Sequence, residues 1–175
     1  MKNKTFNITL SAIIAALYAA LTVATWQFSS LAIQVRLSEA LCILPIFTPA
    51  AIYGLAIGCA LSNFIMGNVI DAVFGTLATL VAAILTRVLA KALKGRLFWL
   101  YPAPAVIANA IAVPLILYYG YGFTTFGSAS GTWAVLSIYA LSVFIGQTIV
   151  CYGVGLPLYF ALKKHKINQI LSKGC

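Results

Sequence analysis

The chain holds two carboxylates, Glu39 and Asp71, and both lie in or beside apolar stretches. Of its 175 residues, 63% are hydrophobic and 7% are charged, so acids are not scattered over a wetted surface as they are in a soluble protein. Moving an ionised side chain into an apolar environment costs about 3 kcal/mol or more, so such a residue marks a functional site by default. The two acids are therefore the first candidates for contact with a ligand.

A carboxylate can accept two adjacent N–H donors at once or pair with a cationic amine. Arg36 lies three residues before Glu39, which puts both on one face of a helix. This pair either forms a buried ion pair or presents Glu39 to a ligand with Arg36 orienting it. Asp71 begins an expected helix, where it either caps the free N–H groups or contacts a ligand.

Further polar and aromatic candidates are Asn68, Asn109, Gln147 and Trp133. Amides within membrane helices commonly bridge two helices, so Asn109 and Gln147 are candidates for that role as well as for ligand contact. Trp133, like Trp26, is expected either in an aromatic belt at the water boundary or stacked on a flat ligand. From depth along the helices alone, these residues are expected to converge on one pocket that opens outward.

The elements that carry these residues are expected to be membrane helices. A helical span needs about 20 apolar residues, and a mean hydropathy of +1.04 is typical of a membrane protein. We predict an all-α integral membrane protein, a compact bundle of six transmembrane helices that forms one domain over residues 1–175. The expected segments are Phe6–Phe28, Leu31–Phe47, Ala50–Met66, Val69–Ala92, Ala103–Tyr119 and Trp133–Leu162.

The basic residues predict the orientation. With six spans and a cytoplasmic N-terminus, ten of the eleven Lys and Arg residues fall on the cytoplasmic side, and only Arg36 falls outside. Both termini are therefore expected in the cytoplasm of a multi-pass protein of the cell membrane. The net charge of +9 is explained by this topology, so a nucleic-acid partner is not expected.

Catalysis, metal binding and cofactors are not expected. The sequence has no GxxxxGK[ST] phosphate loop, and its one histidine, His165, lies in the basic tail. The four cysteines show no CxxC spacing, which argues against a metal site and a disulfide.

Small residues form a stripe on the first helix, where Ala12, Ala16 and Ala20 recur every four residues. Such a stripe lets another helix approach closely, either inside the bundle or from a partner protein. Gly54 and Gly58 form a GxxxG pattern on the third helix. The segment 120–131 is rich in Gly, Ser and Thr and is expected as a mobile loop and a candidate lid.

Several segments together resemble the queuosine-precursor transporter (QueT) family, and the likeness covers essentially the whole chain. The segments are QVRLSEALCILP at 34–45, DAVFGTLATL at 71–80, Asn109, GQTIVCY at 146–152 and Gly155-Leu-Pro157.

The resemblance implies a substrate-binding S component of an energy-coupling factor (ECF) importer. Such a subunit binds its cargo outside the cell and docks on a membrane coupling protein with two ATPases, so the subunit itself does not hydrolyse ATP. Ala12, Ala16 and Ala20 are implied to face the coupling protein. The implied cargo is a deazaguanine base, with Glu39 and Asp71 on its N–H groups and amine, Asn109 and Gln147 on its carbonyl and ring nitrogens, and Trp133 or Trp26 stacked on it.

Two other functions stay open at this point. The first is an S component for another vitamin or nucleobase. The second is a stand-alone transporter that uses Glu39 or Asp71 as a proton relay.

Overall fold

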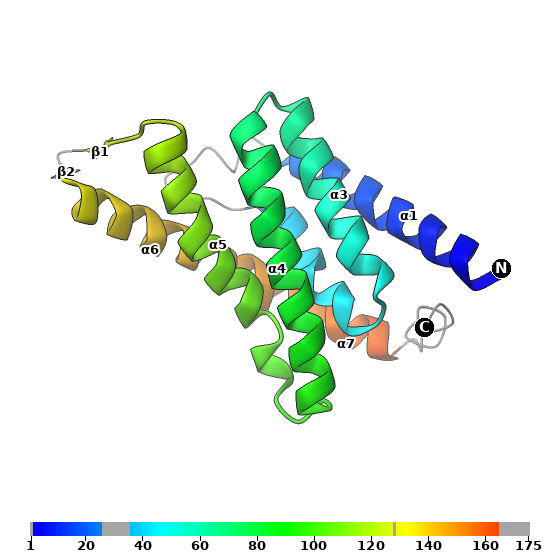
Figure 1. Ribbon diagram of the computed structural model, residues 1–175. Helices are drawn as coiled ribbons and strands as arrows, with labels where there is room; N and C mark the ends of the chain where they lie inside the picture. The colour runs from blue at the N-terminus through cyan, green and yellow to red at the C-terminus, as the bar shows by residue number, and fades with distance from the viewer. Residues whose placement is uncertain (1, 26–35, 128, 165–175) are drawn as a thin grey trace.

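Helices make up nearly all of the computed structural model, which describes residues 2–25, 36–127 and 129–164 (Figure 1). Trp26, residues 31–35 of the second expected helix and His165 lie outside the described residues. In chain order the elements are α1 (Lys2–Ala24), the 3₁₀ helix η1 (Leu37–Ile46), α3 (Ala50–Ile65), α4 (Val69–Leu93), the 3₁₀ turn η2 (Phe98–Leu100), α5 (Ala103–Leu115), the π-helical turn η3 (Ile116–Gly120), β1 (Thr125–Phe126), β2 (Ala129–Ser130), α6 (Thr132–Val150), the π-helical turn η4 (Cys151–Gly155) and α7 (Leu156–Lys164).

Within the described residues, four helical stretches are long and apolar enough to cross a membrane. They are Lys4–Ala24, Val69–Leu93, Phe98–Gly120 and Thr132–Lys164. The 16 residues of α3 span about 24 Å at 1.5 Å per residue, less than the ~30 Å of a hydrocarbon core. The prediction of an all-α membrane protein is therefore confirmed.

The second expected helix differs from the prediction. Its described part forms the ten-residue 3₁₀ helix η1, in which every residue from Ser38 to Pro45 is buried. Runs of 3₁₀ helix longer than three or four residues are uncommon. Here contacts with α1, α3, α4, α6, α7 and η4 surround the segment. Pro45 also lacks the N–H that a regular helix would need at that point.

Helices that follow one another in the chain pack side by side, in the pairs α1–α3, α3–α4, α4–α5 and α5–α6. In Figure 1 the start of α1 and the end of α7 lie on the same side of the molecule, and the β1–β2 hairpin lies on the opposite side. η1 is drawn in cyan near the centre, behind α3 and α4. The core thus surrounds the segment that carries Glu39.

The GxxxG pattern serves packing inside the bundle. A Cβ atom on Gly54 would lie 2.8 Å from the Ser11 carbonyl oxygen, and one on Gly58 would lie 2.8 Å from the Ala15 carbonyl oxygen. α1 therefore lies on α3 at a distance that only glycine permits. The alanine stripe is on another face of α1, and all three of its members, Ala12, Ala16 and Ala20, are exposed.

Two prolines within the helical segments adjoin π-helical turns. Pro114 is followed by η3, and Pro157 is preceded by η4. Proline removes one N–H group and its ring crowds the preceding turn, so the helix widens locally. Gly155 in η4 allows close approach to η1, because a Cβ there would lie 3.3 Å from the Ala40 carbonyl oxygen.

The segment 120–131, expected as a mobile loop and lid, contains a short antiparallel hairpin. Thr125 pairs with Ser130 and Phe126 pairs with Ala129. The Phe126 ring packs edge-on against Tyr139 of α6, with ring centroids 5.3 Å apart. The hairpin therefore rests on the first turns of α6, away from α1 and α3 (Figure 1).

Candidate functional site

Glu39 lies at the centre of the bundle and is 1% exposed. The Tyr18 hydroxyl on α1 donates to its Oε1 at 2.5 Å. The Cys42 thiol, one turn further along η1, donates to Oε2 at 3.0 Å. Both carboxylate oxygens therefore already have a donor from the protein.

Further hydrogen bonds surround this acid. Beside it, the Thr22 hydroxyl donates to the Ser38 hydroxyl at 2.7 Å, a second link between α1 and η1. The Cys151 sulfur lies 3.7 Å from the Glu39 carbonyl oxygen and 3.6 Å from Gln147 Oε1. We call the connected side chains the Glu39 group: Tyr18, Glu39, Cys42, Gln147 and Cys151.

A second set of polar residues centres on Asn63, which is fully buried in α3. Arg36 Nη2 donates to Asn63 Oδ1 at 3.1 Å, and Asn63 Nδ2 donates to the Asp71 carbonyl oxygen at 3.3 Å. We call Arg36, Asn63 and Asp71 the Asn63 group. The described contacts thus contain no direct Arg36–Glu39 ion pair, although Arg36 interacts electrostatically with both acids. The ion-pair alternative was wrong because Asn63 takes the guanidinium and Tyr18 and Cys42 take the carboxylate.

Asp71 differs from Glu39 in having an open carboxylate. It is half-buried, and among the described residues no side chain or backbone N–H donates to its carboxylate oxygens. Asn68 is the residue that caps α4, so Asp71 lies in the first turn and the capping interpretation was wrong. Gly75 leaves space beside it, since a Cβ there would lie 3.8 Å from Asp71 Oδ1 and 3.7 Å from Asn63 Nδ2.

Tyr121 lies close to this acid. Burial raises the pKa of the Tyr121 phenol above its usual value, and the negative charge of Asp71 raises it further. An aromatic ring therefore lies near the open carboxylate, at the end of η3.

Three buried polar atoms on or near α4 and α5 lack a hydrogen-bond partner among the described residues. They are Asn109 Nδ2 on α5, Thr76 Oγ1 on α4 and the Tyr121 hydroxyl oxygen after η3. Asn109 is 4% exposed and follows the buried core residues Ala105 and Val106 by one turn, so it faces the bundle interior. An unpaired buried donor costs about 1–3 kcal/mol, which a bound ligand or water would offset.

The predicted site residues are brought together in part. Tyr18 interacts electrostatically with Arg36 and Cys59 as well as with Glu39, so the Glu39 group and the Asn63 group adjoin. Asn68 lies at their edge, where its backbone N–H donates to the Asn63 carbonyl oxygen at 2.8 Å. Trp133 lies apart, because its side chain is 84% exposed at the start of α6.

Sequence reasoning did not single out Tyr18, Cys42 or Cys59. A signal for Tyr18 is present, because this tyrosine lies in the middle of an alanine-rich span rather than at its boundary. A buried tyrosine hydroxyl usually needs a partner, so its depth alone points to a polar neighbour. The cysteines give no such signal, since they behave as small apolar residues in most cores.

Comparison with known proteins finds a matching family and a curated relative. The family model described as QueT transporter matches residues 8–164. The queuosine precursor transporter QueT of Lactococcus lactis subsp. cremoris (strain MG1363) is 39% identical over 101 residues, a match that covers 56% of this chain and 59% of the relative. No solved structure matches. The family model covers most of the chain, and the chain belongs to the QueT transporter family.

Proposed function

We propose that the chain is the substrate-binding S component of an ECF importer and binds a queuosine precursor, a deazaguanine base, outside the cell. It crosses the cell membrane six times, with both termini in the cytoplasm. A membrane coupling protein and two ATPase subunits supply the energy for uptake. The substrate class rests on the family and on the named relative.

The observation that carries this proposal is the open carboxylate of Asp71, with the unpaired amide of Asn109 as a second polar group in the bundle interior. A guanine-like edge has adjacent N–H donors that one carboxylate accepts in bidentate fashion. Asn109 Nδ2 donates to a carbonyl or ring nitrogen of the base. Arg36 interacts electrostatically with Asp71.

The two acids have different roles in this proposal. Glu39 has both oxygens occupied and 1% of its surface exposed, so it fixes η1 against α1 and holds Arg36 by its charge. Asp71 contacts the base or the amine of an aminomethyl precursor. Tyr121, beside Asp71, is a better-situated stacking partner than the exposed Trp133.

The surface that meets the coupling protein is the alanine stripe of α1. Ala12, Ala16 and Ala20 are exposed, while the opposite side of α1 packs on Gly54 and Gly58 of α3. A stripe of small side chains that no described helix covers allows a second protein's helix to approach closely. A partner helix docked on this stripe would also be linked to the Glu39 group, because Tyr18 of α1 donates a hydrogen bond to Glu39.

We expect Ala16→Leu to lower precursor uptake about tenfold or more in cells that express the coupling module, because a bulkier side chain separates the docked helices. Binding of precursor to the purified subunit stays unchanged. The matched control is Ala134→Leu, at an exposed position on α6, which leaves uptake intact. Normal uptake by Ala16→Leu contradicts the docking surface.

The rival function is a stand-alone, proton-coupled transporter, which the buried carboxylate of Glu39 favours. The same uptake assay separates the two in liposomes that contain this chain alone. The S-component proposal predicts no accumulation under a proton gradient without the ATPases. Accumulation under these conditions supports the rival.

A further inference from the structure

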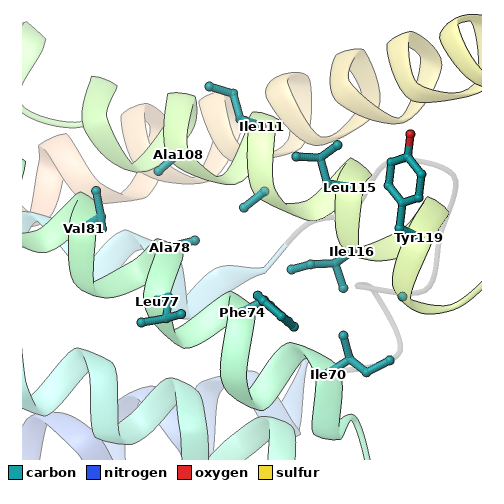
Figure 2. Close-up of a pocket in the computed structure, with 12 residues that line it drawn as sticks. Ile70, Phe74, Leu77, Ala78, Val81, Ala108, Ile111, Leu115, Ile116 and Tyr119 are labelled. Carbon is teal, nitrogen blue, oxygen red and sulfur yellow. The ribbon is translucent and has the colours of Figure 1, made fainter.

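A groove of about 750 Å³ runs between α4 and α5, on a side of these helices that carries none of the polar groups described above. Figure 2 shows its residues in two rows that face each other across the groove, one from α4 and one from α5 and η3. Ala78, Ala108 and Ala112 leave it deep, and the larger side chains of Phe74 and Ile111 flank it.

The groove is apolar along its length. Of the twelve residues that line it, Tyr119 has the only polar side chain, and it stands at one end, where Figure 2 shows its hydroxyl directed away from the groove. Phe74 and Ile111 are 57% and 60% exposed. Water has no hydrogen-bond partner here, and such a surface calls for an apolar occupant.

The length of the groove corresponds to one leaflet of a bilayer. On α4 it extends from Ile70 to Val81, which is about 17 Å at 1.5 Å per residue, against about 15 Å for half of a hydrocarbon core. Both walls belong to helices that are long and apolar enough to cross the membrane. One end therefore lies near the water boundary and the other near the bilayer centre.

The small side chains of the groove favour a thin and flexible occupant. Ala78, Ala108 and Ala112 make it deep between the larger side chains of Phe74 and Ile111. A hydrocarbon chain can follow this irregular surface and reach Ala78 and Ala112.

We propose that this groove holds one acyl chain of a bilayer phospholipid. The chain extends from Tyr119, where the tyrosine hydroxyl meets the headgroup region, to Val81 and Ala108 near the bilayer centre. The lipid is retained as a bound component and fills the gap between α4 and α5. Precursor binding is not required for this, so failure of either proposal leaves the other standing.

The test uses the full chain in membranes that contain phosphatidylcholine with a diazirine on one acyl chain. The protein is purified in mild detergent so that only retained lipid remains, then illuminated and mapped by mass spectrometry. We expect label on residues 70–81 and 108–120, at least about three times denser than on the exposed face of α3 around Ile57 and Leu61. Equal labelling of the three segments, or no retained lipid, overturns the proposal.

Ala78→Phe and Ala112→Phe fill the groove and should each lower the label at 70–81 and 108–120 about threefold or more. Ala134→Phe is the matched control at an exposed position on α6 and leaves the label unchanged. Thermal unfolding in the same detergent identifies any variant that fails to fold, and the wild-type map decides the question on its own. Cross-linking of the groove to a co-purified protein in place of lipid also contradicts the proposal.

Discussion

Asp71→Asn is expected to weaken binding of an aminomethyl-deazaguanine precursor about 10- to 100-fold, as measured by calorimetric titration of the purified chain. The substitution keeps the shape of the side chain but removes its charge and turns one acceptor oxygen into a donor. Hydrogen bonds to a charged group contribute about 1.5–3 kcal/mol, which sets the size of the loss. No donor among the described residues occupies this carboxylate, so the fold should tolerate the change.

Two control variants make the result specific. Lys91→Gln also removes one charge, of the opposite sign, at an exposed position near the end of α4 and should leave affinity unchanged. Glu39→Gln should chiefly lower the unfolding temperature, because Tyr18 and Cys42 both donate to that carboxylate. Unchanged affinity in Asp71→Asn excludes Asp71 from the binding site.

Gly58→Ala is expected to destabilise the protein by about 1–3 kcal/mol, seen as a lower unfolding temperature in detergent. The added Cβ would lie 2.8 Å from the Ala15 carbonyl oxygen and 2.8 Å from Tyr18 Cβ, so α1 must move away from α3. Movement of Tyr18 also disturbs its hydrogen bond to Glu39. This loss outweighs the gain of about 1 kcal/mol that alanine brings to an ordinary helix position.

Gly153→Ala is the matched control, because a Cβ at that position meets no atom within 4 Å. It should leave the unfolding temperature unchanged or raise it slightly. If Gly58→Ala proves as stable as Gly153→Ala, the close packing of α1 on α3 described here is wrong.

The long helices were predictable because their signal is local. α4 was expected at Val69–Ala92 and is found at Val69–Leu93, and the fifth segment, expected at Ala103–Tyr119, is found in α5 and η3. Each is a continuous apolar run bounded by Gly, Asn, Pro or Lys. η1 was not predictable as a 3₁₀ helix, because its conformation depends on the six elements that surround it.

The arrangement of the candidate site was predictable only in small part. Glu39 and Asp71 were singled out because they are the two acidic residues of the sequence, and nothing in the sequence assigns them different roles. What separates them is tertiary: Tyr18 lies 21 residues from Glu39 in sequence and occupies one of its oxygens, while Asp71 meets no donor. Hydroxyl and thiol groups leave no periodic pattern from which such partners can be inferred.

Position along a helix was also not enough to predict which aromatic side chain lies in the candidate site. Trp133 was expected at the water boundary or stacked on a flat ligand; its side chain is exposed at the start of α6, and the aromatic residue beside Asp71 is Tyr121. The direction of a side chain around its helix depends on the packing partners, which the sequence does not specify.

The central claim is that a guanine-like edge meets a free carboxylate inside this bundle. The direct measurement is a titration of the purified chain with aminomethyl-deazaguanine and with a deazaadenine analogue of the same size. The adenine-like edge lacks the paired N–H donors, so we predict one-to-one binding of the first compound and binding of the second that is at least about 100-fold weaker. Equal affinity for the two compounds, or no binding of the first, contradicts the account.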